Sequence, residues 1–177
     1  LKCHLKKKSI LNSIIATIGP SCNTPERSVG MTAWEGVEDM KWHIGTQSAV
    51  DVAKAMDAAW QARNYEEMRT YISDTATLTA SNGYTWESVD AFIDRWKMND
   101  SVWDSNGSTF EWSFTNLFSV DLDPTTGGEH VHADYYGTFT QDGKADNFRV
   151  MNRYYIIDGK IVTWNSYSQE IIEETSE

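Results

Sequence analysis

The sequence predicts an α+β domain in which helices come first and an antiparallel sheet follows. Three observations support this fold class. Apolar residues recur at helical spacing up to about residue 98, they alternate with polar residues from residue 110 onward, and turn-forming pairs separate the alternating runs. A chain of 177 residues with 40 % hydrophobic content has room for one domain with a core. Such an order places the helices on one face of the sheet.

Three helices are predicted before residue 100. The first begins at Ser48, which can cap it, and its apolar positions are Val52, Ala55, Met56, Ala59, Trp60 and Ala62. A break near Asn64 separates it from a second, short helix that carries Met68, Tyr71 and Ile72. A short strand at 75–80 and an Asn-Gly turn come next. The third helix covers 87–98, with one apolar stripe of Val89, Phe92, Ile93 and Trp96.

Four strands are predicted after the third helix, over 110–122, 131–141, 147–157 and 160–169. Polar and apolar residues alternate along them, and the Asp158-Gly159 pair joins the last two. The intervening stretches DPTTGG and QDGKAD have turn composition. Successive strands with short connections form an antiparallel meander.

The first 22 residues have the order of an export signal. A lysine cluster precedes an apolar run at 10–18 that is too short to cross a bilayer, and small residues then lead to Cys22. A cysteine so placed resembles the lipidation site of a bacterial lipoprotein. We therefore expect an exported protein with Cys22 as its lipid anchor, in the periplasm or at the cell surface. Plain secretion and a cytosolic location are the alternatives.

Two further segments flank the predicted domain. Residues 23–47 are polar and contain glycines without a sustained period, so we expect a flexible tether. Trp34 and Trp42 are exceptions that can pack back on the domain. Residues 171–177 are expected to be a C-terminal tail. The sequence shows no internal repeat and no second domain.

The charge balance excludes one class of partner. The net charge is −11 at neutral pH, and the first 22 residues contribute lysines but no acid, so the domain is more acidic than the whole chain. A domain of that charge is repelled by phosphate backbones. We therefore expect no nucleic-acid partner.

Two stretches carry a resemblance to a known superfamily. They are ARNYEEMRTYISDTATL, at the end of the first helix and beyond, and YYIIDGKIVTWNSYSQE, at the end of the sheet. Over about residues 48–170 the chain resembles the nuclear transport factor 2-like superfamily, in particular its SnoaL-like bacterial members. The resemblance implies a cone-shaped, strongly curved antiparallel sheet wrapped around about three N-terminal helices. It also implies a pocket at one end of the cone and a homodimer formed through the outer face of the sheet.

Two asparagines interrupt strand faces that are otherwise apolar. Asn116 has the parity of Trp112 and Phe114, and Asn152 has that of Tyr154. If these faces line the cone, both amides point inward, where an unpaired amide costs about 1–3 kcal/mol. Each amide then bonds either a tyrosine hydroxyl, a tryptophan N–H or a water, or else a polar group of a ligand.

The first predicted function follows from these strand faces. We expect the cone to bind a small, mainly apolar molecule, with no cofactor and no assigned catalysis. The expected ligand-binding residues are Trp112, Asn116, Asn152, Tyr154 and Trp164. An alternative is a dimeric interaction protein whose cone is filled by its own aromatic side chains.

A second alternative is an enzyme of the cyclase, isomerase or dehydratase type. His132 and Asp134 are same-face neighbours on the strand 131–141, where a carboxylate can orient an imidazole as a general base. Their parity is expected on the outer face of the sheet, unless a bulge near Gly137 reverses it. His130 and Glu129 do not complete a usual ligand set, so no metal site is expected.

The resemblance also bears on steroid-isomerase chemistry. Isomerases of the superfamily keep a catalytic carboxylate after the first strand and an oxyanion-binding tyrosine in the first helix. The matching positions in this sequence are Ala80 and Met56. Alanine cannot abstract a proton, and a thioether cannot donate a hydrogen bond to an oxyanion. Both residues argue against that chemistry, and whether another reaction is catalysed stays open.

Overall fold

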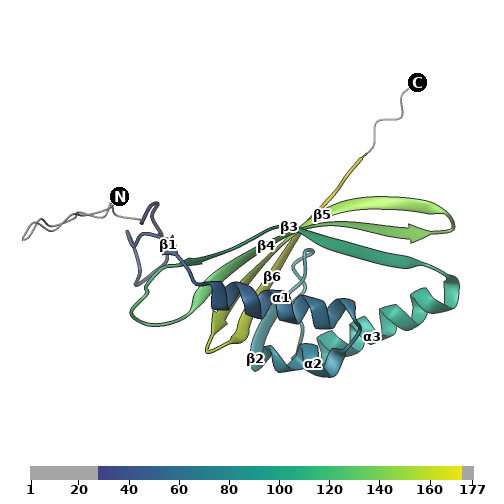
Figure 1. Cartoon of the computed structure of the whole chain (residues 1–177), viewed down its shortest axis with the longest axis horizontal. Helices are drawn as coiled ribbons and strands as arrows, with labels where there is room; N and C mark the ends of the chain where they lie inside the picture. The colour runs from purple at the N-terminus through teal and green to yellow at the C-terminus, as the bar shows by residue number, and fades with distance from the viewer. Residues whose placement is uncertain (1–27, 173–177) are drawn as a thin grey trace, which may run out of the picture.

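The structure, a computed structural model, describes residues 28–172 (Figure 1). Its elements are β1 (His43–Ile44), α1 (Gln47–Gln61), α2 (Tyr65–Thr70), β2 (Ile72–Thr79), α3 (Val89–Asn106), β3 (Thr109–Asp121), β4 (Glu129–Gln141), β5 (Lys144–Ile157) and β6 (Lys160–Glu170). The predicted order of helices followed by a meander is confirmed. None of the described helices is both long and apolar enough to cross a bilayer.

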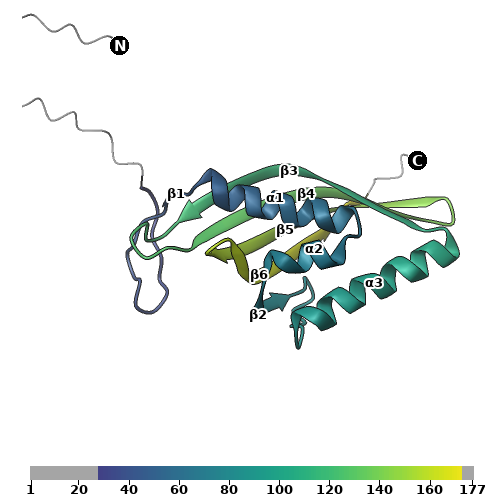
Figure 2. The ribbon, with the colours of Figure 1, turned by 60° about the horizontal axis from the view of Figure 1, so that its bottom comes forward.

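The described strands form one curved, open sheet in the order β1-β3-β4-β5-β6-β2. Only the β2–β6 pair is parallel, and all other neighbours are antiparallel. The three helices lie on one face of this sheet, which we call the inner face (Figures 1 and 2). The opposite face is the outer face. The expected curved sheet wrapped on helices is therefore confirmed.

Two helix ends differ from the expectation. Thr46, rather than Ser48, caps α1 by accepting the Ala49 N–H at 3.3 Å, and Glu129 holds the Thr46 hydroxyl at 2.6 Å. The third helix continues to Asn106 because its final turns still have a partner. Trp103 packs on Phe110 with ring centroids 5.2 Å apart. The helix ends only at Gly107, which has a φ of 74°.

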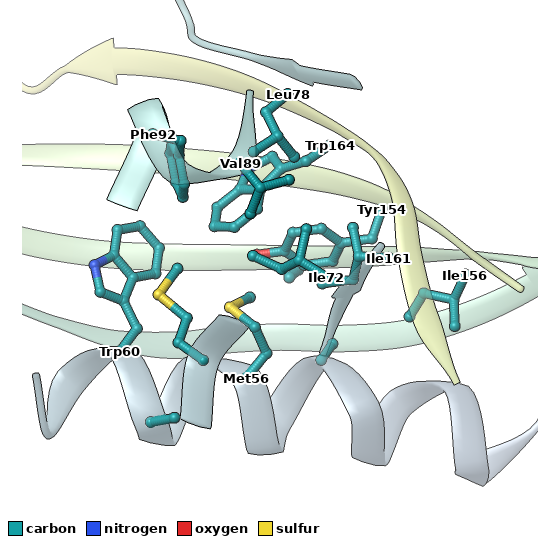
Figure 3. Packing of buried hydrophobic residues seen from close by; sticks show 14 of the residues in the cluster. Met56, Trp60, Ile72, Leu78, Val89, Phe92, Tyr154, Ile156, Ile161 and Trp164 are labelled. Atoms are coloured by element: carbon teal, nitrogen blue, oxygen red, sulfur yellow. The ribbon is translucent and has the colours of Figure 1, made fainter. Parts of the chain in front are cut away.

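The core lies between α1 and the inner faces of β4, β5 and β6. Met56 and Trp60 point from α1 toward the strands, and Tyr154 and Ile161 meet them from β5 and β6 (Figure 3). Trp60 also contacts Trp164 with ring centroids 5.4 Å apart. Large aromatic side chains supply most of the buried area in such a core. The same aromatic cluster sets the size of the space that remains inside the cone.

A bulge in β3 changes which residues face inward. The register with β4 shifts between Phe114 and Asn116, so Thr115 is an extra residue. A single extra residue reverses the alternation beyond it. Phe114 therefore faces inward, but so does Leu117, while Asn116 and Phe118 are exposed on the outer face. The expected inward orientation of Asn116 is wrong for this reason.

The segment before α1 is folded where the structure describes it. His43–Ile44 pair with Val120 and Asp121 of β3, and Val29 forms a bridge with Trp42. Trp34 and Trp42 pack on His130 of β4, with ring centroids 5.8 and 5.2 Å from it. The segment expected to be a flexible tether is thus structured from residue 28 onward. Cys22 and the C-terminal residues 173–177 lie outside the described residues.

Candidate ligand-binding pocket

A cavity of about 270 Å³ lies between α3, the end of β2 and the inner faces of β5 and β6. Its walls are mainly aromatic and come from α1, the loop before α3, α3, β3 and β6: Trp60, Trp86, Phe92, Trp96, Phe110 and Trp164. Its polar lining residues are Thr79, Ser81, Arg95, Asn99, Asn152, Ser166 and Ser168. An apolar space with a few convergent polar groups is the usual form of a small-molecule site.

The cavity lining holds no acid or base. Among the described residues that line it there is no Asp, Glu, His, Cys, Lys or Tyr, and Arg95 is the only charged one. Ala80 lines the cavity, at the position where the resemblance places a catalytic carboxylate. Met56, at the position of the oxyanion tyrosine, is buried in the core and does not line the cavity. General acid-base catalysis has no side chain to act through in this space.

A chain of hydrogen bonds runs behind the cavity wall. The indole N–H of Trp164 donates to Ser166 Oγ at 3.0 Å, and Ser166 Oγ donates to Asn152 Oδ1 at 2.7 Å. Asn152 Nδ2 donates to Tyr154 Oη at 3.1 Å, and Tyr154 Oη lies 3.1 Å from Tyr135 Oη. Asn152 is only 4 % exposed, so these bonds satisfy an amide that is otherwise costly to bury.

A buried carboxylate, Asp57 on α1, has its own hydrogen-bond partners. This residue is 2 % exposed, and its two oxygens accept the Trp112 indole N–H at 2.9 Å and the Gln61 amide at 2.8 Å. Burial raises the pKa of Asp57, while hydrogen bonds from Trp112, Gln61 and Tyr135 act in the opposite direction. Sequence reasoning missed Asp57. Its signal is its position, three residues before Trp60 and four after Ala53 on the buried side of the helix.

Four of the expected ligand-binding residues come together on the inner face. Asn152 and Trp164 line the cavity, and Trp112 and Asn152 line a smaller space of about 40 Å³ next to it. Tyr154 is fully buried behind the wall and supports Asn152 instead of lining the cavity. Asn116 is not part of this group, because it faces outward and donates to Asp134 at 3.2 Å.

The expected catalytic pair lies on the outer face, away from the cavity. His132 stacks on Phe118, with ring centroids 5.1 Å apart, and Asp134 accepts the Asn116 amide. The register between β4 and β5 is regular, so no bulge near Gly137 turns the pair inward. The two side chains also border different outer hollows, of about 460 Å³ for His132 and 570 Å³ for Asp134. Their proposed role as a joint acid and base of the cone pocket is therefore wrong.

Metal ligands are not gathered in the described part of the chain. No three His, Cys, Asp or Glu side chains among residues 28–172 come together as a metal site would require.

The fold is shared with solved structures at low sequence identity. An LEH-like epoxide hydrolase of M. tuberculosis is similar with a TM-score of 0.55 and 14 % identity, over 70 % of this chain and 84 % of that one. The β subunit of benzoate 1,2-dioxygenase from Burkholderia mallei gives 0.57 and 11 %, over 71 % and 91 %. A candidate ketosteroid isomerase from Kribbella flavida gives 0.55 and 10 %, over 76 % and 87 %.

These likenesses show that the chain has the nuclear transport factor 2-like fold, as the resemblance implied. At such low identities they show the fold alone. No protein-family model matches the chain, and no curated protein is significantly similar to it.

Proposed function

We propose that this protein binds a small, mainly apolar molecule in the cavity between α3, β2 and the sheet, without acid-base catalysis at that site. The observation that carries the proposal is the lining itself. Aromatic walls surround a space of about 270 Å³, a few polar side chains such as Asn152, Ser166 and Arg95 reach it, and no Asp, Glu, His, Cys, Lys or Tyr is present among the described lining residues. Engineered apolar cavities of roughly 150 Å³ bind benzene, so this space suits a molecule of one substituted ring.

A cavity-filling variant tests the proposed site. Ala80 lines the cavity, and Ala80→Phe adds a ring inside it without removing any hydrogen bond that reaches Asp57. Isothermal titration calorimetry with 1-phenylethanol is expected to show binding to the wild type and at least about tenfold weaker binding to the variant. Asn116→Leu, on the outer face, is the control and keeps the wild-type affinity. Equal affinities of Ala80→Phe and the wild type would place the bound molecule elsewhere.

A second copy of this chain is the protein partner that we propose, bound through the outer face of the sheet. Tyr136, Met151 and Tyr167 lie together on three adjacent strands of that face and are 40 %, 37 % and 52 % exposed. Clustered aromatic and methionine side chains are typical of the centre of a protein interface.

We also propose that the protein is exported and lipidated at Cys22, as the order of its first 22 residues suggests. The test is metabolic labelling of the full chain with an alkyne analogue of palmitate in a bacterial host. Label is expected on the wild type and absent from Cys22→Ser. Label that persists in the variant, or is missing from the wild type, contradicts the lipid anchor.

A further inference from the structure

We infer that Arg95 binds a carboxylate at the mouth of the cavity, so that the ligand is a small organic acid whose apolar end lies among the buried rings. The inference rests on the proposed binding function and adds the chemical class of the ligand. Arg95 is the only charged residue among the described residues that line this space.

The cavity has a buried apolar end and an exposed polar end. Leu78, Phe92 and Trp164 are buried and lie close to one another, with the ring centroids of Phe92 and Trp164 5.1 Å apart (Figure 3). Ser81 and Arg95 line the same space but are exposed to solvent. A ligand in this space therefore places apolar atoms at the buried end and keeps a charged group partly hydrated at the exposed one.

One face of α3 brings Arg95 into the lining. The helix contributes four lining residues, the last three of them three, four and seven positions after the first: Phe92, Arg95, Trp96 and Asn99. Such a spacing puts them on one side of a helix. Arg95 and Asn99 are one turn apart, so a guanidinium and an amide N–H can converge on the two oxygens of one carboxylate.

Both of these polar side chains have unused donors. Neither Arg95 nor Asn99 makes a side-chain hydrogen bond or an ion pair within residues 28–172. By contrast, the guanidinium groups of Arg63 and Arg69 each pair with two aspartates. A guanidinium has five N–H donors in a fixed fork that matches a carboxylate. In Arg95 this whole capacity is available to a ligand.

The charge of the lining favours an anion with a single charge. No Asp or Glu among the described lining residues repels an acid, and one guanidinium balances one carboxylate. A phosphate monoester carries about −1.5 to −2 charges at neutral pH. In a chain with a net charge of −11, the excess charge of a phosphate would meet no second cation among the described lining residues. We therefore expect carboxylic acids rather than phosphate esters.

The net negative charge of the chain does not cancel this contact. It acts through solvent and is screened over about 8 Å at physiological salt, whereas an arginine and a carboxylate meet at about 2.8 Å. Because Arg95 is exposed, its contribution is that of a surface ion pair. We expect a gain of about fivefold in affinity, rather than the larger gain of a buried pair.

Two probes of nearly the same shape test the inference by isothermal titration calorimetry on the full chain. 3-Phenylpropanoate carries a carboxylate, and 3-phenylpropanamide has a neutral amide in its place. At neutral pH and about 50 mM salt, the wild type is expected to bind the acid about fivefold more tightly than the amide. Equal affinities, or tighter binding of the amide, overturn the inference but leave a binding pocket. If neither probe nor 1-phenylethanol binds, the proposed function fails and the inference fails with it.

Arg95→Gln removes the charge but keeps a polar side chain. It is expected to weaken binding of the acid about fivefold, to the level of the amide, while the amide stays within about twofold of wild type. Lys97→Gln is the matched control, because it removes a positive charge from the same helix at a position outside the cavity lining. It should keep the preference for the acid. A preference that survives Arg95→Gln, or disappears in Lys97→Gln, contradicts the role of Arg95.

Two measurements on the wild type need no variant. Raising the salt from about 50 mM to about 500 mM should weaken the acid about twofold or more and leave the amide unchanged, because only the charged contact is screened. Phenyl phosphate should bind more weakly than 3-phenylpropanoate. An acid that is insensitive to salt, or a phosphate that binds more tightly than the acid, contradicts a carboxylate site at Arg95.

The variant that fills the cavity locates the acid. Ala80→Phe is expected to weaken both the acid and the amide at least about tenfold, because Ala80 lines the same space as Arg95. An acid whose affinity is unchanged in Ala80→Phe is bound outside the cavity, and the inference is then wrong.

Discussion

Asp57 links the stability of the fold to pH. Burial raises its pKa, so the folded chain holds that proton more tightly than the unfolded chain does. The stability that this group contributes is therefore present at low pH and is lost as the pH rises from the unfolded pKa, about 3.9, through the higher folded pKa.

Urea denaturation of the wild type and Asp57→Asn at pH 4 and pH 7 measures this effect. Because asparagine does not titrate, the free energy of unfolding of the wild type relative to the variant is expected to be larger at pH 4 than at pH 7. A difference that stays constant, or that grows toward pH 7, contradicts the raised pKa.

The two asparagines are expected to respond differently to the same substitution. Asn152→Leu removes the buried amide that bonds Ser166 and Tyr154 and should lower the free energy of unfolding by about 1–3 kcal/mol. Asn116→Leu changes an exposed outer side chain and should stay within about 0.5 kcal/mol of wild type. Chemical denaturation of both variants provides the comparison, and similar losses would show that the two environments are alike.

The sequence pattern identified most of the site residues, but it did not give the facing of every side chain. Asn152, Tyr154 and Trp164 lie on regular strands, so the period of two gives their facing correctly. Asn116 lies one residue beyond a bulge that no glycine or proline marks in the sequence. Asp57 was overlooked because an acid on a helix is usually solvent-exposed, and its partner Trp112 lies 55 residues away.

At the scale of elements, the segment before α1 packs on His130 of the sheet, in addition to the pairing of β1 with β3. This imidazole packs against Trp34, Trp42 and Tyr155, and burial together with the charges of Arg153 and His132 lowers its pKa to about 4. The packed state thus favours the neutral ring. The stabilisation that the neutral His130 contributes is complete above the usual histidine pKa of about 6.5. It is lost as the pH falls from there toward 4.

Hydrogen exchange can follow this loss directly. The amides of Val29 and Trp42 bond each other's carbonyls within the segment, and they are expected to exchange faster at pH 5 than at pH 7 after correction for the intrinsic rate. His130→Phe keeps a ring at the position but does not titrate, so its corrected protection should not change over this range. Equal pH dependence in the variant would assign the effect to another group.

Helix and strand types were predictable, but several of their ends were not. The apolar stripe of α3 stops being regular after residue 98, yet the helix continues because Trp103 packs against Phe110 at the start of β3 and against Phe139, 36 residues away on β4. The start of α1 is moved by Glu129, which is 83 residues from Thr46. Contacts of this range leave no mark in the local period of a sequence.

At the scale of the whole molecule, the outer face determines the expected assembly. Sedimentation equilibrium is expected to give the mass of a dimer for the wild type and of a monomer for Tyr136→Glu, which buries a charge in the proposed interface. The control is Lys54→Glu, on an exposed position of α1, which lies on the opposite side of the sheet (Figure 1). A wild type that stays monomeric at all concentrations rules out the second copy as partner of this face.

The α+β organisation follows from the residues, but the cone does not. Alternating runs predict strands and their antiparallel order, whereas the curvature and the inner cavity came from the resemblance to a superfamily. The parallel pairing of β2 with β6, which closes the far edge of the sheet, joins residues about 90 positions apart. The periodicity of the sequence does not predict that pairing.

The bulge in β3 has a consequence for solubility. Apart from the pairing of β1 with Val120 and Asp121 and the bond from the Gly45 N–H to the Ser119 carbonyl, the edge of β3 away from β4 has no strand neighbour among residues 28–172. A long, regular edge strand that carries Phe110, Trp112 and Phe114 would be a template on which further chains could pair and form fibrils. The bulge at Thr115 interrupts the even spacing of the N–H and C=O groups of β3 and bends the strand. Thr115, which turns Asn116 away from the cavity, thereby also hinders aggregation at this edge of the sheet.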